Sequence, residues 1–258
     1  MSLAISLRSE MLKTRRTSSF WLAVVGAAFI PTIFFLIYLF KSEKMIPQLK
    51  MMPWNVHFFM SWQVFSSFLF PMFIILISAL VPQVEFRNNT WKQVFASPQT
   101  TGEIFFSKFL SVQGMVLLCV VSFNVLLILA AVLANLLNSK YPFFSTPIDW
   151  EALVRLNLRT YVAVLGISAI QFLVSMRFKS FIGPVGIGLA LLIGGQVATG
   201  LGWEKAWLIP FAHPLLTLKS MALDKNAWLV RHEWLSIGYA AFFLTLGYLD
   251  LRFRKEKG

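Results

Sequence analysis

The sequence predicts an all-α integral membrane protein with six transmembrane helices. Of its 258 residues, 57% are hydrophobic and only 13% are charged, whereas charged residues make up about a quarter of an ordinary soluble domain. The apolar residues are gathered into long runs, and most lysines and arginines stand at the ends of these runs. We therefore expect one transmembrane domain that covers residues 1–258.

Six apolar runs are each long enough to cross a bilayer, for which about 20 helical residues suffice. The predicted spans are residues 20–40, 58–82, 109–136, 160–176, 181–201 and 233–251. Pro31 and Pro71 interrupt the first two, and proline in a helix interior predicts a kink.

Two further segments are predicted to lie at the membrane surfaces. Residues 2–17 place apolar side chains four residues apart among basic ones, which predicts an interfacial amphipathic helix. Residues 202–232 mix tryptophans, prolines and charges, which indicates an outer re-entrant or interfacial element.

The distribution of basic residues predicts the orientation of the chain. With six spans both termini lie on one side, and that side carries 13 of the 23 lysines and arginines in shorter segments. Because basic residues favour the cytoplasmic side, both termini are expected to be cytoplasmic. The net charge of +12 is then explained by anionic headgroups rather than by nucleic acid.

One long polar stretch, residues 83–108, separates the second and third spans on the cytoplasmic side. Charged residues alternate with aromatic ones there: Glu85, Arg87 and Lys92 are charged, Phe86 and Trp91 are aromatic, and Asn88 adds an uncharged polar side chain. This pattern favours a short amphipathic helix, Glu85 to Gln93, that offers one face to a partner. The alternative is a solvated loop held at the membrane by its tryptophan.

The residue types in the spans exclude several classes of function. No ionisable side chain is expected at mid-depth, whereas ion-driven transporters usually need one; polar residues such as Gln171 and Gln196 are expected to bond helix to helix. His57, His213 and His232 lack metal-ligand spacing, Cys119 is alone, and no phosphate-binding loop is present. We expect no catalytic residue, no metal and no cofactor in this chain.

Small residues recur every four positions in the fifth span. Gly186, Ala190, Gly194 and Ala198 form a stripe that would let another helix approach closely. The partner helix belongs either to this chain or to a second subunit, and packing within the chain is the preferred alternative.

Taken together, these features resemble the permeases of type-2 ABC exporters. The resemblance covers nearly the whole chain and rests on the basic helix before the first span, the six spans and the loop after span two. In that loop Glu85, Pro98 and Lys108 match the family's acidic residue, proline and basic residue.

The resemblance implies partners and a mechanism. Two copies of a separate cytosolic ATPase would bind ATP and Mg, and a second permease chain, identical or paralogous, would complete the machine in a bacterial cytoplasmic membrane. Glu85 to Gln93 would be the coupling helix, with Phe86 and Trp91 as apolar anchors and Arg87 and Lys92 at the rim. The turn with Arg177 and Lys179 would be a smaller second contact.

The implied function is export of an amphipathic or hydrophobic substrate such as a peptide antibiotic, a lipid or a drug. The small size is similar to the branch that confers immunity to antimicrobial peptides, including lantibiotics. Two alternatives remain open from the residues: a non-transporting membrane scaffold that recruits a cytosolic partner, and a membrane enzyme acting on lipids through His213 or His232.

Overall fold

A computed structural model describes residues 3–15, 17–223 and 228–253. Within them, six helices are long and apolar enough to cross a membrane, which confirms the predicted fold class. They are α2 (Ser18–Phe40), α4 to α5 (Pro53–Val64 and Phe70–Asn88, joined by the π-helical turn Phe65–Leu69), α7 (Thr101–Leu137), α8 (Trp150–Arg177), α9 (Ile182–Gly200) and α11 (Arg231–Phe253). Several of these helices extend beyond the predicted apolar runs, because polar residues continue the same helix past the apolar stretch.

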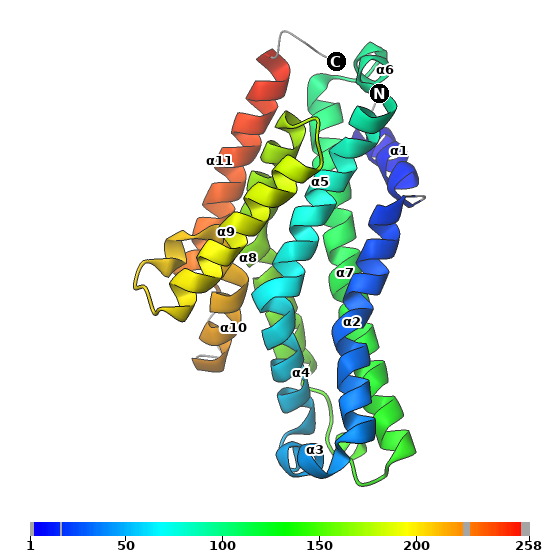
Figure 1. Ribbon diagram of the computed structural model, residues 1–258, viewed down its shortest axis with the longest axis vertical. Helices are drawn as coiled ribbons and strands as arrows, with labels where there is room; N and C mark the ends of the chain where they lie inside the picture. The colour runs from blue at the N-terminus through cyan, green and yellow to red at the C-terminus, as the bar shows by residue number, and fades with distance from the viewer. Residues whose placement is uncertain (1–2, 16, 224–227, 254–258) are drawn as a thin grey trace.

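Shorter elements lie at the two ends and on one side of the bundle. At the end of the bundle where α11 ends are α1 (Leu3–Arg15) and α6 (Trp91–Ala96), whereas α3 (Ser42–Leu49) lies at the opposite end (Figure 1). Residues 2 and 16 of the expected interfacial helix lie outside the described residues. The segment after α9 contains the 3-10 turns Ala206–Leu208 and Pro210–Ala212 and then α10 (His213–Leu223), which packs on α8.

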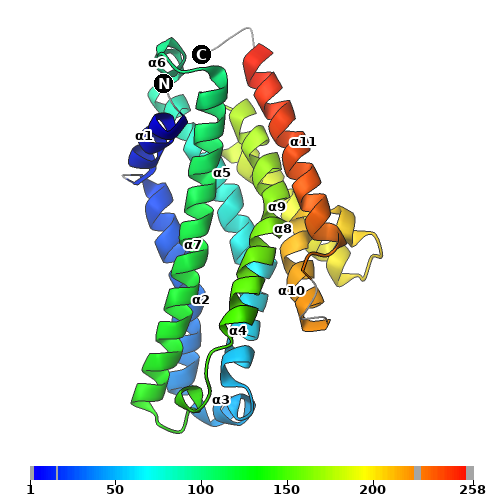
Figure 2. The same ribbon diagram turned by 180° about the vertical axis from the view of Figure 1, so that it is seen from behind.

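The bundle is built from long helix pairs. α2 packs along α7, α11 packs along α8, and α5 contacts both α7 and α8, so that it connects the two pairs (Figures 1 and 2). Aromatic rings fill the centre: Phe65 stacks on Phe123 at 3.8 Å between ring centroids, with Trp62 against both. These rings are buried and closely packed, and this packing holds the helices in a fixed arrangement relative to one another.

A proline explains the π-helical turn in the second span. Pro71 has no N–H to donate to the carbonyl of Ser67 four residues earlier, and the turn Phe65–Leu69 precedes it directly. The side-chain amide of Gln196 in α9 donates a hydrogen bond to this Ser67 carbonyl, and the amide of Gln171 donates to the carbonyl of Pro184. The predicted helix-to-helix role of these two glutamines is therefore confirmed.

The small-residue stripe of α9 does not pack within the chain. A Cβ atom added at Gly186 or Gly194 would meet no atom within 4 Å outside its own helix neighbourhood in the described structure, so the preference for packing inside the chain is wrong for these glycines. The inward face instead contains Gly188, Leu192 and Gly195, whose spacing of four and three follows the 3.6-residue helical period. Both faces carry small residues, and the sequence pattern does not distinguish them.

This difference predicts unequal effects of two matched substitutions. A Cβ at Gly188 would lie 2.7 Å from both Gln171 Oε1 and Ile75 Cγ2, so Gly188→Ala is expected to lower the free energy of unfolding by about 1–3 kcal/mol through overpacking. Gly194→Ala, on the open face, is expected to be within about 0.5 kcal/mol of wild type. Thermal unfolding in detergent checks both, and a larger loss for Gly194→Ala than for Gly188→Ala would show that α9 is packed the other way round.

Candidate functional site

The polar stretch after span two folds as a helix end, a sharp turn and a second short helix. α5 runs on to Asn88, where Asn89 takes a left-handed conformation with φ 52°. The N–H of Thr90 donates to the carbonyl of Glu85 at 3.0 Å, and that of Asn89 donates to the carbonyl of Phe86 at 3.4 Å, as in a Schellman motif that ends a helix. The expectation of one helix from Glu85 to Gln93 is therefore wrong, because this turn divides it.

The chain then turns back into the bundle. After α6, Ser97 adopts an extended conformation before Pro98, and Thr100 begins α7 with a capping box: its hydroxyl accepts from the N–H of Glu103, and the Glu103 carboxylate accepts from the N–H of Thr100. We call residues 85–108, from the end of α5 through α6 to the start of α7, the elbow. It lies beside α1, at the end of the bundle where α11 also ends (Figure 1).

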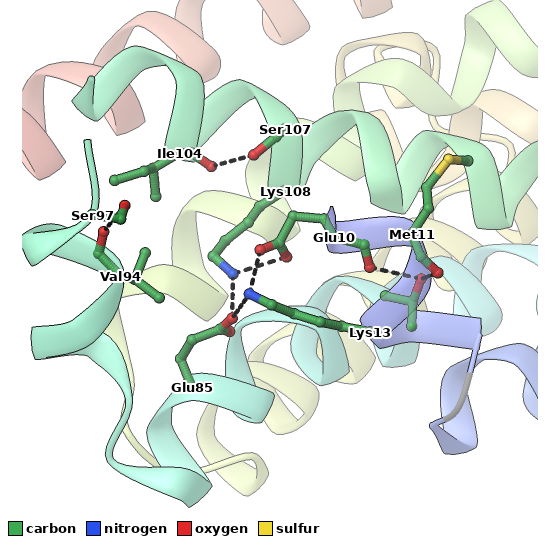
Figure 3. A network of polar contacts seen from close by, with 10 residues as sticks. Glu10, Met11, Lys13, Glu85, Val94, Ser97, Ile104, Ser107 and Lys108 are labelled. Carbon is green, nitrogen blue, oxygen red and sulfur yellow. Dashed lines mark hydrogen bonds and ion pairs between the residues drawn. The ribbon is translucent and has the colours of Figure 1, made fainter. Parts of the chain in front are cut away.

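Four charged side chains from three helices meet beneath the elbow (Figure 3). The Lys108 ammonium of α7 lies 2.7 Å from Glu85 Oε1 of α5 and 3.0 Å from Glu10 Oε2 of α1. The Lys13 ammonium of α1 bridges the same two carboxylates, at 2.8 Å from Glu10 Oε1 and 3.1 Å from Glu85 Oε1. We call Glu10, Lys13, Glu85 and Lys108 the charge cluster; it ties α1 to the two transmembrane helices α5 and α7.

Most of the charge cluster is buried, so its charged groups must be paired with one another rather than with water. The side chains of Lys108 and Glu85 are 0% and 1% exposed, that of Glu10 is 9% exposed, and only Lys13 reaches solvent, at 39%. Burial alone would raise the pKa of Glu10, but the charges of Lys108 and Lys13 outweigh it and hold the pKa below its usual value. Burial would lower the pKa of Lys13, but its hydrogen bonds to Glu10 and Glu85 and their charges raise it. Glu10 and Lys13 are therefore kept ionised around neutral pH.

Trp91 contacts the inside of the elbow rather than its surface. The residue is 6% exposed, and its ring lies 5.2 Å from that of Phe86 and 5.6 Å from that of Phe95, between centroids. The Lys108 ammonium lies 5.4 Å from the centroid of the indole, within the range of a cation–π contact. Trp91 therefore fastens α6 to the charge cluster, and its ring has little exposed surface for the predicted role as an apolar anchor to a partner.

The outer side of the elbow is polar and open. Arg87 and Asn88 at the end of α5 and Lys92 and Gln93 in α6 are exposed. Between α1, α5 and α6 lies a cavity of about 420 Å³. Its lining is mostly polar and includes Ser9, Glu10, Lys13, Glu85, Asn88, Thr90, Gln93 and Gln99.

The second predicted contact, the turn after α8, is joined to the same end of α5. The side-chain amide of Gln83 donates to the carbonyl of Lys179 at 3.0 Å. Lys179 is exposed, whereas Arg177 lies 2.6 Å from Asp250 Oδ1 of α11. The structure thus brings Lys179 close to the elbow and directs Arg177 to a different helix.

A second buried ion pair lies far from the elbow. Arg159 of α8 contacts Glu233 of α11 with distances of 3.0 Å and 3.2 Å from its Nε to the two carboxylate oxygens, and the side chains are 2% and 0% exposed. Ser220 of α10 accepts a further hydrogen bond from Arg159 at 2.7 Å. Sequence reasoning did not find this pair, because its members are 74 residues apart.

The histidines are engaged in structural hydrogen bonds. His57 Nε2 donates to the carbonyl of Leu127 at 3.1 Å, so its Nδ1 accepts from the Tyr38 hydroxyl at 2.6 Å. His213 donates to the carbonyl of Trp207, and His232 is bonded to Thr217. His213 and His232 lie together, 5.6 Å between ring centroids, although the sequence did not suggest it. In the part of the chain that the structure describes, no group of three potential metal ligands occurs.

Comparison with known proteins adds one similarity. A family model described as ABC-2 family transporter protein matches residues 6–195, which include most of α1, the elbow, the first four spans and most of α9. No curated protein and no solved structure matches the chain.

Proposed function

Because the chain belongs to the ABC-2 family of transporter proteins, we propose that it is the permease subunit of an ATP-driven exporter. Membership of this family makes it a membrane component of an ABC transporter, and the energy for transport is then expected from an ATPase partner. We further propose that this ATPase is a separate cytosolic subunit which binds ATP and Mg, that two copies of it act with two permease chains, and that both termini are cytoplasmic. The bacterial cytoplasmic membrane remains the proposed location.

The charge cluster carries this proposal. A partner that pushes on α6 meets a segment fixed through Trp91 and Lys108 to α5, α7 and α1 at once. Since buried, paired charges are costly to separate, the three helices would move as a unit instead of being pulled apart. Closure of the ATPase would in this way be transmitted to the second and third spans.

The docking surface in this proposal is the exposed side of the elbow. Arg87, Asn88 and Lys92 would contact the ATPase directly, with Lys179 nearby on the adjoining turn. Glu85, Phe86 and Trp91 would act by holding α6 in place, because Glu85 and Trp91 are buried and Phe86 packs on Trp91. Arg177 is not assigned to this contact, because its guanidinium is directed towards Asp250 of α11.

The proposed substrate is amphipathic or hydrophobic, such as a peptide antibiotic, a lipid or a drug, and immunity to antimicrobial peptides is one such role. What supports this class is the surface of the spans, where large apolar side chains including Trp21, Phe29 and Phe242 are exposed. The open face of α9, with Gly186, Ala190, Gly194 and Ala198, would then pack on the second permease chain at close range.

A charge reversal tests the docking surface. Arg87→Glu combined with Lys92→Glu is expected to reduce the ATPase activity that co-purifies with the affinity-tagged chain from its native host by more than about tenfold, because like charges across an interface cost several kcal/mol. The matched control is Lys44→Glu with Lys50→Glu, which makes the same charge change on exposed residues at the opposite end. Equal loss in both variants, or loss in neither, would refute the docking surface.

A further inference from the structure

A groove near the elbow end of the bundle has a lining that is not explained by the coupling function. It lies between α8, α9 and α11, has a volume of about 590 Å³, and is lined by nine residues. Seven of them are apolar, among them Leu173 of α8, Ile187 of α9 and Leu249 of α11, and the remaining two are Arg177 and Asp250. This volume falls within the range of roughly 300–1,000 Å³ that is typical of small-molecule sites.

The apolar part of the groove is open to the surroundings of the bundle. Ile187, Leu246 and Leu249 are between 38% and 41% exposed, and Phe253, at the end of α11, is 72% exposed. Because these residues belong to helices that are candidate spans, the medium against them is the bilayer. Hydrocarbon chains are therefore the material that fills the groove.

The mouth of the groove is cationic. The Arg177 side chain is 60% exposed although it pairs with Asp250 at 2.6 Å, so part of its guanidinium remains accessible. Lys179 follows the lining residue Phe178, and Arg252 precedes the lining residue Phe253; both basic residues are exposed. Arg177 is thus the lining residue that offers a positive charge, and Lys179 and Arg252 are basic residues close to the lining in sequence.

We propose that this groove binds an acidic phospholipid. Its acyl chain lies against Leu173, Ile187 and Leu249, and its phosphate binds the guanidinium of Arg177, which can donate two parallel hydrogen bonds to phosphate oxygens. Basic pockets between transmembrane helices on the cytoplasmic side recognise anionic headgroups in this manner. Because the lipid contacts α8, α9 and α11 together, it stabilises their arrangement, whichever partner binds the elbow.

Native mass spectrometry of the intact chain in detergent, titrated with dioleoyl-phosphatidylglycerol or dioleoyl-phosphatidylcholine, tests the proposal. We expect phosphatidylglycerol to bind about tenfold more tightly, because both lipids carry the phosphate but the choline group of phosphatidylcholine brings a second positive charge next to Arg177. Arg177→Gln is expected to abolish this preference and Arg177→Lys to retain most of it. Arg8→Gln, which removes an exposed arginine of α1 outside the groove, is expected to leave the preference unchanged.

A variant of the partner carboxylate separates lipid binding from damage to the ion pair. Arg177→Gln and Asp250→Asn both break the Arg177–Asp250 pair, but Asp250→Asn leaves the arginine and removes the competing anion. We therefore expect Asp250→Asn to tighten phosphatidylglycerol binding by about threefold to tenfold, while Arg177→Gln weakens it. Weakening in both variants would mean that the pair only supports the fold, and the proposal would fail.

Other occupants of the groove give distinct results. If inorganic phosphate competes with phosphatidylglycerol and raises the unfolding temperature as strongly, the site binds a free anion and the lipid assignment is overturned. If Leu249→Trp abolishes dimers of the chain without changing lipid binding, the groove is an interface between two copies. If Leu249→Trp instead weakens the binding of both lipids by filling the groove, the proposal is supported.

Discussion

Replacing Lys108 with methionine is expected to lower the free energy of unfolding by about 3–5 kcal/mol, the range observed when one partner of a buried ion pair is removed. The side chain is 0% exposed and contacts Glu10 at 3.0 Å and Glu85 at 2.7 Å. Without it, two buried carboxylates share one partly exposed lysine, Lys13. Thermal or denaturant unfolding in detergent measures the loss.

The matched control for this prediction is Lys13→Met. Lys13 contacts the same two carboxylates, but it is 39% exposed, so that water screens its charge and the loss is expected to stay below about 1 kcal/mol. Adding Glu85→Gln to the Lys108→Met variant removes one orphaned charge and is expected to restore part of the stability. A Lys13→Met variant as unstable as Lys108→Met would contradict the burial argument.

Arg159→Met is expected to have an effect of similar size, about 3–5 kcal/mol, because it leaves the fully buried Glu233 carboxylate without its arginine. Arg155→Met, one turn earlier in α8, removes a pair with Glu151, which is 80% exposed. Its cost is expected to be below about 1 kcal/mol. Unfolding of both variants under the same conditions gives the comparison.

Variants of the two buried ion pairs also distinguish a loss of stability from a loss of coupling to the ATPase. Lys108 lies in the charge cluster, whereas Arg159 lies far from the elbow. At a temperature where both variants remain folded, Lys108→Met is therefore expected to lose stimulation of the partner ATPase, and Arg159→Met is expected to keep it. Loss in both variants would show that any weakening of the bundle disturbs coupling, and that the charge cluster has no special part in it.

The number and order of the helices could be predicted from the sequence because the bilayer imposes a strong constraint. Apolar runs of about 20 residues have few alternatives to a spanning helix. The ends of the helices were harder to predict. α5 continues through Glu85 to Asn88, because its end is set by hydrogen bonds from the N–H groups of Asn89 and Thr90 to carbonyls of the helix and not by hydropathy.

The candidate site was found only in part. The polar stretch 83–108 and the importance of Glu85 and Lys108 followed from sequence patterns, but the pairing with Glu10 and Lys13 did not. Those residues are separated from Lys108 by almost a hundred positions, and contacts over such distances leave no local periodicity. The one available signal was Glu10 itself, an acidic residue within a strongly basic helix.

Trp91 and the α9 stripe show a second reason why the structure differs from the prediction made from the sequence. Amphipathic periodicity identifies two faces of a helix, but it does not say which apolar face packs inside and which meets a partner or lipid. In α6 the aromatic face packs inward, on Lys108 and Phe86. In α9 one small-residue face packs inward at Gly188 and Gly195, while the other remains open at Gly186 and Gly194.

The central claim is that the elbow is the docking site for the ATPase, and site-specific photo-crosslinking tests it most directly. A photoreactive amino acid in place of Lys92 is expected to form a covalent adduct with an ATP-hydrolysing protein in membranes of the native host. The same amino acid in place of Lys44, exposed at the opposite end of the bundle, is expected to form none. An adduct with the ATPase from position 44, or none from position 92 while the complex hydrolyses ATP, would contradict the account.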